Sequence, residues 1–325
     1  MAKDKPGVSI NEILWHPSKS DTRVPIRFAD NLPLLKGSPT PSTLPTLVFP
    51  GYGVGAGGRK RLLYHLAEQD KHAVVVDLPL THPALRGDGD LVIQLAREGP
   101  HLVGNALRER YRLDEPIPAL GQSKGAAIVG RAIEEDHTGI GDVALVQPPE
   151  LHRATPLEVP DREERRLVRK LVRSLALNSS GQERNWGTMR AEGISLVTFI
   201  QDTAIGQFRI IAGPVVTGSL VSPVLAHVES GNTVLVMSSH RDSVFPGGQI
   251  FSTLDAAAQA ATKSGAQVRE GGRLLVYLDE GVPHLSIDNT KGRALVNTAL
   301  DRLKNPKGSN GAILLYPTIR TRLVK

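Results

Sequence analysis

The hydrophobic residues of the chain alternate between short uninterrupted runs and longer segments in which they recur every three to four positions. The alternation begins at about residue 46, where apolar runs of four to six residues start to be followed by segments with helical spacing. Uninterrupted apolar runs are typical of strands that are covered on both faces of a parallel sheet. The pattern therefore predicts an α/β fold, with helices on both faces of a mostly parallel sheet of about eight strands. The strands are expected at residues 10–16, 24–28, 46–50, 73–78, 117–120, 143–146, 233–237 and 273–278, and the helices near 62–67, 91–110, 124–135, 220–229, 250–263 and 291–303.

One interval breaks this alternation. The segment between residues 146 and 233 is far longer than the dozen or so residues that a parallel crossover needs. Residues 150–230 are therefore predicted to form an inserted lid, and residues 1–149 and 231–325 to form the core. The insertion includes an amphipathic helical pattern that carries Leu167, Leu171 and Leu175. We expect the lid to lie over the carboxyl ends of the strands, where open α/β sheets bind their ligands.

The C-terminal segment 312–325 is not placed by the pattern. Its apolar first half, AILLY, fits either an added edge strand or a segment that docks on a neighbour.

Composition narrows the class of protein. Hydrophobic residues make up 40% of the chain and charged residues 22%, which are ordinary values for a globular protein. The absence of cysteine excludes disulfides, thiolate metal sites and a cysteine nucleophile, and is compatible with a reducing cytosol. The net charge of +6 is spread along the chain, and aromatic residues are only 4%, so the sequence does not predict nucleic-acid binding.

The sequence predicts neither a membrane span nor a metal site. The first residues lack the apolar region of a signal peptide. The longest charge-free stretch, residues 210–226, is interrupted by glycine and proline and falls short of the roughly 20 apolar residues of a membrane helix. The ten histidines are scattered without the close spacing of metal ligands. We expect a cytoplasmic protein without a cofactor.

The segment Gly121-Gln122-Ser123-Lys124-Gly125 carries the main chemical signal. It matches the Gly-x-Ser-x-Gly nucleophile elbow, and it lies between a predicted strand and a predicted helix, as that motif requires. Such a turn holds its serine at strained dihedral angles, so its neighbours must be small. The alternative interpretation is a glycine-rich strand–helix turn with an idle serine.

With this motif in place, the chain resembles the α/β-hydrolase superfamily over most of its length outside the insertion. The segment Phe49-Pro50-Gly51-Tyr52-Gly53 is similar to the family's His-Gly-x loop, with Pro50 in place of the usual histidine. The resemblance implies that the backbone N–H groups of Tyr52 and Lys124 form an oxyanion hole. It also implies that Gly51 and Gln122, beside them, contact the substrate. A plain glycine-rich turn is the alternative; the spacing fits a dinucleotide-binding loop poorly.

The resemblance extends to the acid and the base of a catalytic triad. Asp242 follows a predicted strand and a turn, and by resemblance it would orient the histidine. Ser238 and Ser239 occupy the turn where the family usually has a glycine. There are two alternatives. Asp242 is an ordinary loop residue, or Glu150 is the catalytic acid in its place.

His284, in Val282-Pro283-His284-Leu285, stands where the family carries its catalytic base. His240 precedes Asp242 and is interpreted as a bystander. A serine nucleophile argues against the haloalkane dehalogenases and epoxide hydrolases, which use an aspartate.

These residues together predict a serine hydrolase that cleaves a carboxylic ester through an acyl-enzyme. Residues 194–226 are rich in isoleucine, leucine and valine, which favours a small to medium apolar substrate. Thioester cleavage, C–C bond cleavage and acyl transfer use the same triad and stay open. A non-catalytic receptor or scaffold with this fold is the alternative from another class. The sequence does not indicate the acyl and alcohol groups or the oligomeric state.

Overall fold

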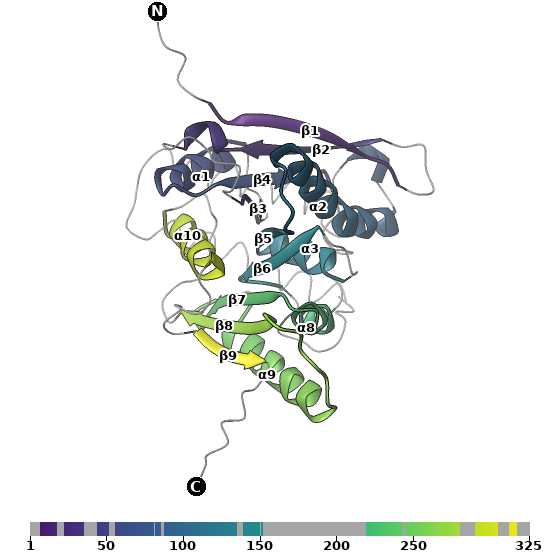
Figure 1. Cartoon of the computed structure of the whole chain (residues 1–325), viewed down its shortest axis with the longest axis vertical. Coiled ribbons are helices and arrows are strands. Elements are labelled where there is room, and N and C mark those ends of the chain that lie inside the picture. Colours follow the sequence, from purple (N-terminus) through teal and green to yellow (C-terminus); the bar gives the residue numbers. More distant parts are fainter. Residues whose placement is uncertain are drawn as a thin grey trace, which may run out of the picture.

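The computed structural model describes residues 7–17, 23–35, 44–51, 56–80, 82–85, 88–134, 139–149, 151, 219–242, 245–279, 290–304 and 312–316. These residues form one nine-stranded sheet in the order β1-β2-β4-β3-β5-β6-β7-β8-β9 (Figure 1). The strands are β1 (Ser9–Trp15), β2 (Val24–Asp30), β3 (Thr46–Phe49), β4 (Ala73–Asp77), β5 (Ile117–Gln122), β6 (Ile140–Val146), β7 (Thr233–Ser239), β8 (Arg273–Asp279) and β9 (Ala312–Tyr316).

Strands β3 to β8 pair in parallel. Strands β2 and β1 extend this parallel set beyond β4 in antiparallel pairs, and β9 extends it beyond β8 in an antiparallel pair. Strand β3 has β4 on one side and β5 on the other. The chain leaves β3 towards β4 and leaves β5 in the opposite direction towards β6, so the switch point of the sheet lies between β3 and β5. In open parallel sheets, such a switch point is where ligands bind, at the carboxyl ends of the strands.

Helices cover both faces of the sheet, as Figure 1 shows. One face packs against α1 (Ala56–Glu68) and α10 (Thr290–Lys304) through a core that includes Leu62, Leu66 and Val296. The other face packs against α2 (Gly89–Tyr111), α3 (Lys124–Ala132), α8 (Val221–Glu229) and α9 (Gly247–Lys263). Neighbouring residues of a strand supply opposite faces, since the side chains of a strand alternate. This is why Val74 and Val76 of β4 belong to the second core and Val75 to the first.

The alternation of strands and helices predicted from the sequence is confirmed, with boundaries that differ by a few residues. The largest difference at a helix end is in α1, which begins at Ala56 rather than near residue 62, and α3 ends at Ala132 rather than at residue 135. Of the two alternatives for the C-terminal segment, the structure shows the edge strand, because Ala312–Tyr316 pairs with β8 as β9. Within the described ranges, no helix combines the length and the apolar character that crossing a bilayer requires.

Most of the predicted insertion, including the pattern with Leu167, Leu171 and Leu175, lies outside the described residues. Its last part is described: α8 packs on the sheet with Val221, Val224 and Val228 buried. The assignment of residues 150–230 to a lid over the carboxyl ends of the strands therefore stays a prediction.

A buried polar cluster joins β2, β4 and α2. The carboxylate of Asp30 lies 3.0 Å from Nε2 of His72 and accepts hydrogen bonds from the Tyr111 hydroxyl and, at 2.8 Å, from the Leu32 N–H. Burial by itself raises the pKa of Asp30, but the hydrogen bonds from His72, Tyr111 and Leu32 favour the charged form, and the net result is a lowered pKa. Burial and the bond to Asp30 raise the pKa of Tyr111. The cluster stabilises the fold through an ionised carboxylate.

Candidate active site

Ser123 occupies the sharp turn between β5 and α3. Its φ of 52° and ψ of −118° lie in a region that non-glycine residues rarely adopt. Such a conformation costs about 1–3 kcal/mol and persists only where the surrounding structure enforces it. The Ser123 N–H donates to the carbonyl oxygen of Val146 at 2.9 Å, and its own carbonyl accepts the N–H of Ala126 at 2.9 Å. The turn is therefore held by the neighbouring strand β6 and by the first turn of α3.

The two glycines of the motif are required by close backbone approaches. An ideal Cβ on Gly121 would lie 2.3 Å from the carbonyl oxygen of Gly125. An ideal Cβ on Gly125 would lie 1.9 Å from the carbonyl oxygen of Phe49. No side chain fits in either place, since real contacts of this kind are essentially never shorter than 3.0 Å. The geometry is that of the strained strand–helix turn predicted from Gly-x-Ser-x-Gly.

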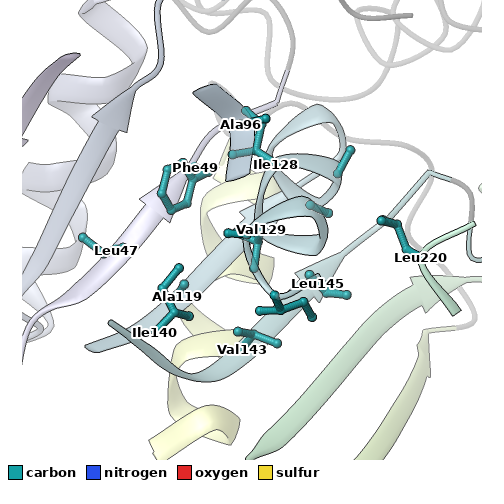
Figure 2. Packing of buried hydrophobic residues seen from close by; sticks show 14 of the residues in the cluster. Leu47, Phe49, Ala96, Ala119, Ile128, Val129, Ile140, Val143, Leu145 and Leu220 are labelled. Carbon is teal, nitrogen blue, oxygen red and sulfur yellow. The ribbon is translucent and has the colours of Figure 1, made fainter. Parts of the chain in front are cut away.

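Packing of α3 fixes the direction of this turn. Figure 2 shows Ile128 and Val129 of α3 among Phe49 of β3, Leu145 of β6 and Leu220, which precedes α8. All of these side chains are almost completely buried. Because protein cores are close-packed, α3 has little freedom to move relative to β3 and β6. Ser123, directly before α3, is held with it and is itself half-buried.

The loop after β3 lies against the same turn. Phe49 pairs with Gly121 across the parallel strands β3 and β5. An ideal Cβ on Gly51 would lie 3.3 Å from both the Gln122 carbonyl oxygen and the Ser123 Cβ, so the Gly51 backbone touches the turn. The next residue, Tyr52, lies outside the described residues, and its role as an oxyanion donor stays a prediction.

Lys124 and Gln122 flank the serine on either side. Lys124 is half-buried and is the first residue of α3. Amide groups of a first helical turn have no acceptor within the helix, and the helix dipole favours negative charge near them. This environment suits the predicted oxyanion role of Lys124. The Gln122 side chain is 1% exposed, and its Oε1 would lie 3.9 Å from a Cβ on Gly51. The Gln122 side chain therefore lies beside the Gly51 backbone, and substrate contact by Gly51 and Gln122 stays a prediction.

Asp242 lies just beyond the carboxyl end of β7, two strands away from β5. It is 1% exposed, and its Oδ1 accepts the N–H of Phe245 at 2.9 Å. Since β5 and β7 belong to the same parallel set, their carboxyl ends lie along one edge of the sheet. The structure thus places Ser123 and Asp242 at the same edge.

Three further positions singled out in the sequence are Glu150, His284 and His240. Glu150 and His284 lie outside the described residues, so the structure does not choose between Asp242 and Glu150 as the acid. His240 is described: its side chain is exposed, and its N–H donates to the Asp279 carbonyl oxygen at 3.1 Å. No group of three or more histidine, aspartate or glutamate side chains is arranged to hold a metal ion in the described part of the chain.

Two residues at this edge had no clear signal in the sequence. Gln147, directly after β6, is fully buried at a left-handed φ of 50°, and its N–H donates to the Met237 carbonyl oxygen at 2.7 Å. Ser239, the last residue of β7, is 1% exposed and makes hydrogen bonds within the turn that leads to Asp242. The sequence marked Ser239 only as a departure from the family's usual glycine.

No protein-family model matches the chain, and no curated protein matches it in sequence. Solved structures do match. A bacterial membrane phospholipase A is 15% identical, with 92% of this chain and 88% of the other covered and a TM-score of 0.58. The esterase RhEst1 from Rhodococcus sp. is 13% identical, with 91% and 99% covered and a TM-score of 0.56. A bromoperoxidase from Bacillus anthracis is 14% identical, with 90% and 99% covered and a TM-score of 0.53.

At these identities the likeness concerns the fold, and it extends over nine-tenths of the chain. The chain has the α/β-hydrolase fold that its motifs predicted.

Proposed function

We propose that the protein is a serine hydrolase that cleaves carboxylic esters through an acyl-enzyme. The observation that carries this proposal is the strained turn at Ser123, where Gly121 and Gly125 allow the backbone to pass at distances that exclude a Cβ. A strained, half-buried serine at the switch point of the sheet has a cost in stability, and function is the usual reason for such a cost. This is also the argument against a non-catalytic receptor or scaffold.

The mechanism follows from the proposed roles. The Oγ of Ser123 attacks the ester carbonyl carbon while His284 takes the hydroxyl proton. The negative charge on the carbonyl oxygen is stabilised by the N–H groups of Tyr52 and Lys124. Asp242 stabilises the imidazolium cation, which then gives its proton to the leaving alcohol. Water repeats the sequence on the acyl-enzyme, releases the acid and restores Ser123.

An ester is the favoured substrate class because two of the matched structures are named as an esterase and a phospholipase. Thioester cleavage, C–C bond cleavage and acyl transfer use the same groups and are the alternative reactions. The apolar composition of residues 194–226 supports a small to medium apolar acyl or alcohol group.

A series of p-nitrophenyl esters from acetate to dodecanoate tests the proposal. We expect kcat/KM to rise to a short- or medium-chain optimum and then to fall, because each buried methylene adds about 0.8 kcal/mol until the pocket is full. Ser123→Ala should lower kcat by at least about a thousandfold. Equal turnover by Ser123→Ala would contradict the hydrolase proposal. A strict preference for acetate would contradict only the apolar pocket.

A further inference from the structure

The turn between β7 and α9 is held by a serine where the family usually has a glycine. The Ser239 Oγ accepts a hydrogen bond from the Arg241 N–H at 3.1 Å, and the Ser239 carbonyl oxygen accepts one from the Asp242 N–H at 3.2 Å. A serine hydroxyl that accepts from the backbone two residues on replaces a backbone hydrogen bond of a turn. Ser239 thus holds the backbone of Arg241 through its hydroxyl group and the backbone of Asp242 through its carbonyl oxygen.

We propose that Ser239 is a positioning residue for Asp242, and that its hydroxyl fixes the direction in which the carboxylate points. The inference rests on the proposed function, in which Asp242 orients the catalytic histidine.

Further contacts leave the turn little room to rearrange. The N–H of His240 donates to Asp279 on β8 at 3.1 Å, and the Asp242 carboxylate accepts from Phe245 at 2.9 Å. An ideal Cβ on Gly247 would lie 2.7 Å from the Ser239 carbonyl oxygen, so the start of α9 packs directly against the Ser239 backbone. A change of the Ser239 side chain removes the hydroxyl bond to Arg241 and leaves the Asp242 carboxylate and the backbone donors and acceptors of the turn chemically unaltered.

The role has a signature in the pH dependence of the rate. A carboxylate close to an imidazole raises its pKa, because the negative charge favours the protonated ring. If loss of the Ser239 hydroxyl lets the carboxylate turn away, the pKa of His284 falls and the acid limb of the kcat/KM profile moves to lower pH. A residue that merely stabilised the fold would lower the melting temperature and leave that limb in place.

The neighbouring serine provides a matched control. Ser238 is also buried, at 4% exposed, on the same strand, but its hydroxyl has no hydrogen-bond partner among the residues that the structure describes. Ser238→Ala therefore removes the same atom from the adjacent position without removing a hydrogen bond to any described residue.

The experiment compares Ser239→Ala, Ser239→Cys, Ser239→Thr and Ser238→Ala with the wild type. Hydrolysis of p-nitrophenyl butyrate is followed from pH 5 to 8.5, together with thermal melts. Cysteine keeps the shape of the side chain with a weak acceptor, and threonine keeps the hydroxyl. We expect Ser239→Ala and Ser239→Cys to lose about tenfold or more in kcat with KM little changed. Their acid limb should move down by about half a pH unit or more. Ser239→Thr should stay within about threefold of the wild type in kcat, and Ser238→Ala should match the wild type in kcat and in its acid limb.

Wild-type kcat and an unmoved acid limb in Ser239→Ala or Ser239→Cys would overturn the inference. A lower kcat in Ser239→Ala with an unmoved acid limb would also overturn the inference, since it indicates a structural role. So would a kcat in Ser239→Thr that is as low as in Ser239→Ala. Failure of the proposed function is seen separately, as ester turnover that survives Ser123→Ala or is absent from the wild type, and the inference then falls with it.

Discussion

Gly125 approaches Phe49 so closely that an ideal Cβ on the glycine would lie 1.9 Å from the phenylalanine carbonyl oxygen. The contact brings the first turn of α3 onto the end of β3. Two features of the proposed site are thereby joined, because Ser123 directly precedes α3 and Gly51 directly follows Pro50 at the end of β3. The Ser123 turn and the Gly51 backbone are thus held together by direct backbone contact in addition to the side-chain packing of α3.

Replacing Gly125 by alanine should therefore separate the loop from the nucleophile. We expect Gly125→Ala to lose about 1–3 kcal/mol in the free energy of unfolding, as overpacked variants do, and about a hundredfold or more in kcat. Urea denaturation and ester hydrolysis measure the two effects. Gly248→Ala is the control, since the described atoms nearest to a Cβ there belong to the His240 side chain, at 3.7 Å and beyond. Wild-type stability and activity in Gly125→Ala would contradict the geometry.

The identity of the acid is decided by two carboxylate variants. Asp242 is buried and anchored by Phe245 at the carboxyl end of β7, which supports it as the acid. We expect Asp242→Asn to lower kcat by about 10⁴-fold, because the amide no longer stabilises the imidazolium or fixes its tautomer. Glu150→Gln should change kcat by less than about threefold. The opposite result, activity in Asp242→Asn with loss in Glu150→Gln, would move the acid to Glu150.

The buried cluster of Asp30, His72 and Tyr111 predicts how stability depends on pH. The pKa of Asp30 in the folded protein lies below its ordinary value, so its ionised form stabilises the fold. That contribution is complete above the unfolded pKa of about 3.9 and is lost as the pH falls through the lower folded pKa. We expect Asp30→Asn to be less stable than the wild type by about 1.5–3 kcal/mol at pH 7.

Denaturation at a series of pH values from 7 to 2.5 checks this sign. The stability difference between the wild type and Asp30→Asn should shrink as the pH falls below about 4. Glu12→Gln, which removes the exposed ion pair with Arg27, is the control and should change stability by less than about 1 kcal/mol at any pH. A difference that grows on acidification would show that the sign is wrong.

The fold was predictable because its signal is local. Buried strands such as β4, with AVVVD, and amphipathic helices such as α10 have different periods, and the order of the elements follows from the chain. The edge strand β9 was one of two alternatives, because a short apolar run can pair with a sheet or pack on a helix equally well. The hydrogen bonds of Asp30 could not be predicted, since they join residues 42 and 81 positions apart.

The candidate site also has features that the sequence could predict and features that it could not. Ser123 and its glycines could be predicted because a strained turn needs small residues at fixed neighbouring positions. The left-handed backbone of Gln147 could not, because it depends on the hydrogen bond to Met237 on another strand. The role of Ser239 could not be predicted either, because the sequence shows that the usual glycine is missing but does not show the hydrogen bond that the Ser239 hydroxyl accepts from Arg241.

A fluorophosphonate probe is the sharpest test of a nucleophilic Ser123, because it reacts preferentially with a serine that is activated as a nucleophile beside an oxyanion hole. The labelled protein is digested, and the modified peptide is identified by mass spectrometry. We expect one modified residue, Ser123, with no labelling of Ser123→Ala and strongly slowed labelling of His284→Ala. Absence of labelling in the wild type, or undiminished labelling of Ser123→Ala, would contradict it.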